Sequence, residues 1–141
     1  MTAMELSYED STRALEAALA RAREIGVRLS VAVVDQAGNP VALARMTGAR
    51  RGTTSFACQG KAMVAAIWGV PSAEVAARMG PGGPIAEHAQ SLYGHRLLFL
   101  GGGLPLKDGE RVVGAIAASG GTGDQDLQVA TAGADAFNRR S

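Results

Sequence analysis

The sequence has few of the residues on which whole classes of protein depend. Cysteine occurs once in 141 residues, as Cys58, so neither an internal disulfide nor a cysteine-only metal site can form within one chain. That usage is typical of a reducing compartment, and we expect a cytoplasmic protein. No apolar stretch has the length of a membrane span. The acidic opening, MTAMELSYED, also differs from the basic and apolar segments of a signal peptide.

Aromatic residues and excess charge are scarce as well. Only 4% of residues are aromatic while 47% are hydrophobic, so the core must consist mostly of Ala, Val, Leu and Ile. Such a composition is typical of a globular chain, and we expect a single domain over residues 1–141. Lys and Arg number 14 against 13 for Asp and Glu, without a long block of either sign. We therefore expect neither nucleic acid nor a membrane as a partner.

The hydrophobic pattern predicts an α/β fold. Spacing and end signals predict helices over residues 7–26, 53–69, 72–79 and 124–137, with one or two helical turns before Tyr93. Alternating or β-branched runs predict strands over residues 27–35 and 41–46, and about three more between 96 and 119. Because hairpin signals such as Asp108-Gly109 dominate, we expect a mainly antiparallel sheet of about five strands flanked by helices.

A glycine-rich loop, SGGTGDQD at residues 119–126, leads from a strand into the last helix, where free N–H groups can bind an anion. It has neither the Gly-Lys-Ser/Thr of a phosphate loop nor the glycine spacing of a dinucleotide-binding loop. We predict that Thr122 or Asp124 caps the helix. The same loop can form a pocket wall, so the candidate ligand-binding residues here are Ser119, Gly120, Gly121, Asp124 and Gln125.

Three longer stretches carry a resemblance to a known family. They are SVAVVDQAGNPVALARM, KAMVAAIWGVPS followed by GPGGP, and GGGLPLKDGERVVGAIAASGGTGDQD. In this order they resemble the GlcG/HbpS-like family of small haem-binding or haem-degrading proteins, which is related to the C-terminal domain of some corrinoid adenosyltransferases. The resemblance covers roughly residues 30–134. It implies a profilin-like α/β sandwich, haem as a candidate cofactor, and self-association into a homo-oligomer.

The chain departs from the family pattern after ARM. Family members usually continue with an acid, a glycine and an alanine, whereas this chain has Thr47 in the acidic place, followed by Arg50 and Arg51. Together with Arg45, these arginines can hold a carboxylate or a haem propionate, because the guanidinium group binds such anions through two parallel hydrogen bonds. The alternative is that Arg50 and Arg51 lie solvated in a loop.

Three residues are candidates for acid–base chemistry. Lys61 is the only charged residue between 53 and 69, and it can bind a carboxylate, act as a base or nucleophile, or only extend to solvent. His88 with Glu87, next to the GPGGP loop, is a candidate for proton transfer. Either His88 or His95 can also be an axial haem ligand. We predict no metal site of zinc type, since His-x-x-x-His spacing is absent.

These residues suggest two functions that each require a bound small molecule. The first is a protein that binds haem or a related tetrapyrrole. Its pocket would lie between three segments, which are the Gly80–Pro84 loop, the 119–126 loop and the 53–69 helix. Gly82 and Gly83 would form the wall on the side of the first loop. Four aromatic residues can pack on the porphyrin: Phe56, Trp68, Tyr93 and Phe99.

The second is a cofactor-independent lyase, isomerase or deaminase acting on a small carboxylate in a catabolic pathway. Arg45 would then hold the anion, Lys61 or His88 would transfer a proton, and the amides of the 119–126 loop would stabilise an oxyanion. A structural or regulatory subunit without chemistry is a third class. The residues alone leave all three classes open.

Overall fold

Helices and strands follow one another in nine elements. The computed structural model describes residues 5–52, 54–80 and 82–139, so Thr53, where the second helix is predicted to begin, lies outside the described residues. The elements are α1 (Tyr8–Glu24), β1 (Ser30–Asp35), β2 (Pro40–Arg45), α2 (Thr54–Trp68), α3 (Ser72–Met79), α4 (Pro84–Leu92), β3 (Gly103–Asp108), β4 (Arg111–Ser119) and α5 (Gly123–Asn138).

The four strands form one sheet in the order β2-β1-β4-β3, and every neighbouring pair is antiparallel. This confirms the expected α/β class and the antiparallel sheet. The two hairpins form for local reasons. In the first turn the Asp35 carboxylate accepts hydrogen bonds of 2.9 Å from the N–H groups of Ala37 and Asn39. In the second, Gly109 has a φ of 64°, the left-handed conformation that the Asp-Gly signal predicts.

The segment 96–102 differs from the prediction of about five strands. That prediction is wrong for the described residues, because this segment forms no strand and the sheet has four. It crosses α2 instead at Gly60, where a Cβ atom would lie 2.7 Å from the carbonyl oxygen of Arg96. The Gln90 side chain makes the two hydrogen bonds that a neighbouring strand would make to Leu97. It donates to the Leu97 carbonyl at 2.7 Å and accepts from the Leu97 N–H at 3.1 Å.

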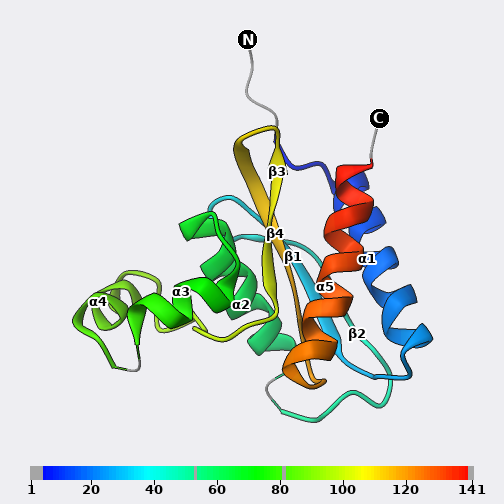
Figure 1. The fold of residues 1–141 in the computed structure, drawn as a ribbon, viewed down its shortest axis with the longest axis horizontal. Coiled ribbons are helices and arrows are strands. Elements are labelled where there is room, and N and C mark those ends of the chain that lie inside the picture. Colours follow the sequence, from blue (N-terminus) through cyan, green and yellow to red (C-terminus); the bar gives the residue numbers. More distant parts are fainter. Residues whose placement is uncertain (1–4, 53, 81, 140–141) are drawn as a thin grey trace.

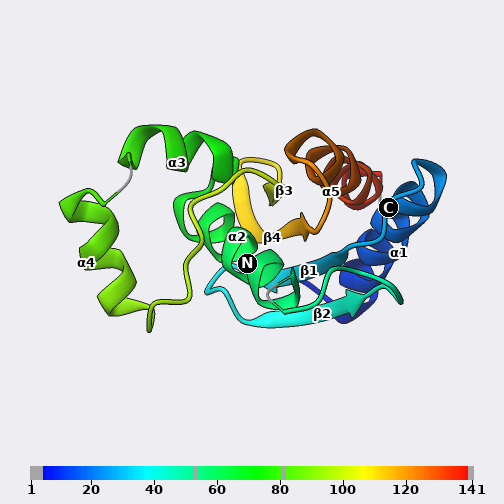
Figure 2. The ribbon, with the colours of Figure 1, turned by 90° about the horizontal axis from the view of Figure 1, so that it is seen from below.

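Helices cover both faces of the sheet (Figures 1 and 2). Alternation along β1 sends Val31 and Val33 to the face covered by α1 and α5, and Val34 to the face covered by α2. The core is built largely from alanine and valine, as the composition predicts. No helix in the described part of the chain is both long and apolar enough to cross a membrane.

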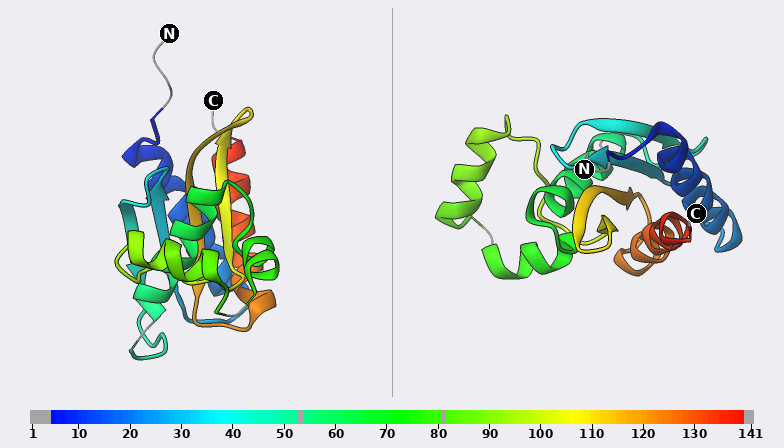
Figure 3. Two further views of the ribbon diagram at one scale, coloured as in Figure 1. Left: turned by 90° about the vertical axis from the view of Figure 1, so that its left-hand side faces the viewer. Right: turned by 90° about the horizontal axis from the view of Figure 1, so that it is seen from above.

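Helices α3 and α4 extend away from the sheet as an arm (Figures 1 and 3). Gly80 and Gly82, with φ values of 66° and 68°, supply the left-handed residues between the two helices. A small apolar cluster joins the arm to α2 and includes Val64, Val75 and Ala89. The profilin-like description, which came from the family resemblance, stays a prediction.

Candidate functional site

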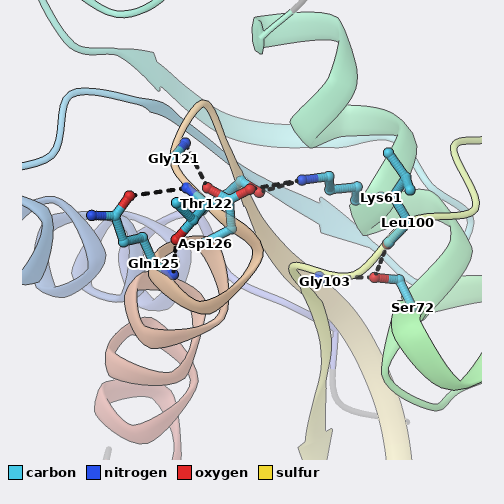
Figure 4. A network of polar contacts seen from close by, with 9 residues as sticks. Lys61, Ser72, Leu100, Gly103, Gly121, Thr122, Gln125 and Asp126 are labelled. Atoms are coloured by element: carbon cyan, nitrogen blue, oxygen red, sulfur yellow. Dashed lines mark hydrogen bonds and ion pairs between the residues drawn. The ribbon is translucent and has the colours of Figure 1, made fainter.

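Lys61 lies buried in the centre of α2 and makes an ion pair that the sequence did not reveal. Its Nζ atom donates to Asp126 Oδ2 at 3.0 Å and to the Ala118 carbonyl at 3.1 Å (Figure 4). The exposed fraction of Lys61 is only 4%. The pair therefore connects α2, the end of β4 and the first turn of α5 at one end of the sheet.

The glycine-rich loop closes on itself through its own polar groups. The Thr122 hydroxyl accepts from the Gln125 N–H at 3.2 Å, and the Gln125 side chain accepts from the Thr122 N–H at 2.9 Å (Figure 4). This capping box confirms Thr122 as the helix cap. Asp126 Oδ1 accepts from the Gly121 N–H at 2.9 Å, so two loop amides are already bonded and do not point freely at a ligand.

Ser72 holds the backbone next to this ion pair. Its hydroxyl donates to the Leu100 carbonyl at 2.6 Å and accepts from the Gly103 N–H at 2.9 Å (Figure 4). Gly102 packs directly on the pair, because a Cβ atom there would lie 3.1 Å from Lys61 Nζ. The start of β3 is therefore held in one position relative to α2 and α3.

A groove of about 600 Å³ runs along α2 beside the segment 95–100. Its wall is mostly apolar, and two large side chains in it face solvent: Phe56 is 74% exposed and Leu100 is 54% exposed. His95 and Arg96 line the same groove and supply an imidazole and a guanidinium. Ser119, a predicted ligand-binding residue, lines it as well. Large apolar pockets with a few polar groups are the usual form of a small-molecule site.

His95 has an unusual backbone conformation. Its φ is 59°, and it is the one residue other than glycine with a positive φ in the described ranges. Gly94 precedes it with a φ of 65°, and the His95 N–H donates to the Gln90 carbonyl at 2.8 Å. A left-handed residue of this kind costs about 1–3 kcal/mol, and such residues cluster at functional sites. This turn places His95 and Arg96 side by side on the groove.

The other predicted site residues lie in separate places. The Arg45 guanidinium donates to the Ala49 carbonyl at 2.5 Å and so folds the turn after β2. Arg50 and Arg51 are exposed in the following loop, and Asp124 is exposed in the first turn of α5. His88 is exposed on α4.

Two smaller sets of predicted residues also lie apart from the groove. Glu87 and Gly82 line a cavity of about 350 Å³ between α3 and α4, while Gly83 packs on the Met79 carbonyl. Gly120, with a φ of 132°, packs on Leu29. Lys61 is thus buried in the body of the protein while Glu87 and His88 are exposed on the arm, and the structure does not bring them together. Their catalytic roles stay predictions.

Sequence reasoning missed three features of this region. Asp126 is the partner of Lys61, whereas the predicted site residues of this loop included Asp124 and Gln125 but not Asp126. Arg96 was not singled out, and its position directly after a histidine was the signal available. Phe56 was considered only as an aromatic residue among four. In the described residues, no group of three or more His, Cys, Asp or Glu side chains is placed to hold a metal ion.

The Cys58 thiol of the folded protein is expected to resist iodoacetamide at mildly alkaline pH and to react fully in urea. Burial raises its pKa from 9.0 to about 12, so the reactive thiolate is scarce. Since the folded pKa lies above the unfolded value, the thiol stabilises the fold fully below about pH 9, and this contribution is lost as the pH rises towards 12. Mass spectrometry of the labelled protein measures the reaction, and rapid labelling without urea would contradict the prediction.

An antiparallel sheet with helices on both faces defines a small α/β domain, and an apolar groove on it carries an imidazole and a guanidinium. A family model described as haem degrading protein HbpS-like matches residues 6–135. The chain belongs to this HbpS-like family, as its motifs indicated.

Individual relatives agree with that assignment. An uncharacterised 15.0 kDa protein from the dhaT-dhaS intergenic region of Citrobacter freundii is 33% identical over 129 residues, which cover 87% of this chain and 85% of that protein. The corrinoid adenosyltransferase PduO of Citrobacter freundii is 28% identical over 139 residues, which are 99% of this chain and 41% of PduO. The solved structure of a PduOC complex with haem is 27% identical, has a TM-score of 0.83, and is matched over 96% of both chains.

Proposed function

We propose that this protein binds haem in the groove along α2, with His95 as the axial ligand. The observation that carries the proposal is the meeting of an imidazole and a guanidinium in an apolar groove of about 600 Å³. The similarity to a protein whose structure contains haem supports the choice of ligand.

The donor groups fit haem chemically. Imidazole is a common axial ligand of haem iron, and within the described residues no hydrogen bond occupies the His95 ring. Phe56, Leu98 and Leu100 offer apolar surface to a porphyrin, and Phe56 is otherwise largely exposed to water. Arg96 offers the charge that a propionate requires. When bound, haem supplies an iron centre for ligand and electron chemistry, while the residues named here bind and orient it.

A hemin titration followed by visible absorption tests this proposal. We expect the wild-type protein to show a saturable Soret shift at one haem per chain. His95→Ala is expected to weaken binding about tenfold or more, because loss of even indirect support for a metal ligand typically has that effect. His88→Ala is the matched control, since His88 lies on α4 and does not line the groove.

The outcomes separate the two histidines. Binding that His88→Ala abolishes and His95→Ala leaves intact would overturn the proposed ligand. No saturable shift in the wild-type protein would overturn haem binding itself. Circular dichroism of each variant checks that the fold is retained.

Self-association is part of the same proposal. Two further apolar side chains, Ile85 and Leu92, are each 67% exposed on α4, and contact with a second copy would remove them from water. Sedimentation of the protein with and without haem measures the oligomeric state.

A further inference from the structure

We propose that a second site, separate from the groove, binds a small molecule through a multiply charged oxyanion such as a phosphate or dicarboxylate group. It is a cavity of about 520 Å³ between the end of α1 and the turn after β2, and Arg23, Arg28, Met46 and Thr47 are among its lining residues. Nothing in the proposed function uses these residues.

The position of the Arg28 side chain on the wall of this cavity is fixed by a hydrogen bond and by packing. Its Nη1 atom donates to the Thr47 carbonyl at 2.8 Å. Its aliphatic part lies on Gly48, where a Cβ atom would come within 2.9 Å of Arg28 Cδ. Gly48 has a φ of 86°, which also favours glycine. One hydrogen bond and close packing therefore orient the guanidinium, while its other N–H groups stay available for a ligand.

No acidic side chain neutralises the two arginines. Within the described residues, neither Arg23 nor Arg28 forms an ion pair. The acid nearest to them along α1, Glu24, is paired with Arg21 at 2.8 Å. Two unpaired guanidinium groups on one cavity attract an oxyanion, and each can bind it through two parallel hydrogen bonds.

Two carbonyl groups in the last turn of α1 already accept hydrogen bonds. Helix ends carry partial negative charge on their last carbonyls. Here the Ala22 carbonyl accepts from the Val27 N–H at 3.0 Å, and the Arg23 carbonyl accepts from the Gly26 N–H at 3.2 Å. Gly26, with a φ of 72°, makes this closure of the helix end. Arg23 and Arg28 supply the charged side chains of the cavity wall.

Isothermal titration with pyrophosphate and, separately, with citrate tests the site at low and at physiological ionic strength. We expect saturable binding of at least one probe at one site per chain. Arg23→Ala and Arg28→Ala are each expected to weaken it about tenfold or more, since hydrogen bonds between charged groups are among the stronger ones. Arg111→Ala is the control, because Arg111 is exposed at the start of β4, beside the β3–β4 turn.

Each result decides the proposal. Tighter binding of pyrophosphate identifies a phosphate ligand, and tighter binding of citrate identifies a carboxylate ligand. The absence of saturable binding of either probe would overturn the site. An equal loss of affinity in all three variants would also overturn it, because such a loss indicates only a general charge effect. Arg23→Ala removes no hydrogen bond of the described fold, so it keeps the test valid if Arg28→Ala does not fold.

Discussion

Replacing Lys61 by alanine is expected to lower the free energy of unfolding by about 3–5 kcal/mol, because it leaves the Asp126 carboxylate charged and buried without its partner. The side chains of both residues are almost wholly buried, and Nζ and Oδ2 are 3.0 Å apart. The Ala118 carbonyl loses its donor in the same variant. Urea unfolding followed by circular dichroism measures the change.

Two further variants show whether the buried charge is the cause. Lys107→Ala removes the other lysine of the chain, which is exposed on β3, and should change the free energy by about 0.5 kcal/mol at most. Lys61→Met combined with Asp126→Leu removes both charges and should recover much of the loss. The recovery stays incomplete because the Gly121 N–H then has no acceptor. A Lys61→Ala protein as stable as Lys107→Ala would refute the structural role of the pair.

The same pair bears on the alternative enzyme function. A lysine that acts as a base or nucleophile must lose its proton and reach a substrate, whereas Lys61 donates two hydrogen bonds in a buried position. The oxyanion role of the loop also competes with the bonds that the Gly121 and Thr122 amides already make. These contacts favour a structural role, and action on a small carboxylate stays a prediction that no contact here supports directly.

Gly133→Ala is expected to destabilise the protein by about 1–3 kcal/mol through overpacking between α1 and α5. A Cβ atom at Gly133 would collide with the Ile116 side chain and would lie 2.9 Å from the Ala14 carbonyl oxygen. Neither neighbour can move easily, since one is backbone and the other is fully buried in the core. The higher helix propensity of alanine offsets about 1 kcal/mol at most.

The matched control lies in the same helix. A Cβ atom at Gly123 meets nothing within 4 Å, so Gly123→Ala should leave the midpoint of thermal unfolding unchanged or slightly raised. Thermal unfolding of both variants under one set of conditions gives the comparison. Equal stability of the two proteins would show that α1 and α5 pack less closely than the structure indicates.

Much of the fold was predictable because it depends on neighbours in the chain. Ser7 was predicted to begin the first helix, and its hydroxyl accepts the Asp10 N–H at 3.0 Å. Thr122 was one of two predicted caps of the last helix, and Asp108-Gly109 was predicted to turn between two strands. In each case the interacting groups are at most three residues apart, so the sequence contains nearly all the information needed.

The candidate site was less predictable because its parts come from distant segments. The predicted pocket combined the Gly80–Pro84 loop with the 119–126 loop, but Gly82 lines the cavity between α3 and α4, whereas Ser119 lines the groove along α2. The segment 96–102 has the apolar character of a strand, yet it lies across Gly60 and forms one wall of the groove. The sequence identifies His95 as a candidate axial haem ligand. Its position on the groove follows only from the way the segment 96–102 crosses α2.

The sequence by itself determined the class of fold, the order of most elements, their caps and turns, and the family. Periodicity and capping act over a few residues and are independent of how the elements pack. Only the tertiary structure decided that Lys61 pairs with Asp126, 65 residues away, that the fifth expected strand is a crossing segment, and that Arg23 and Arg28 share a cavity. Such contacts depend on which faces of the elements meet, and that is settled by burial of the whole core.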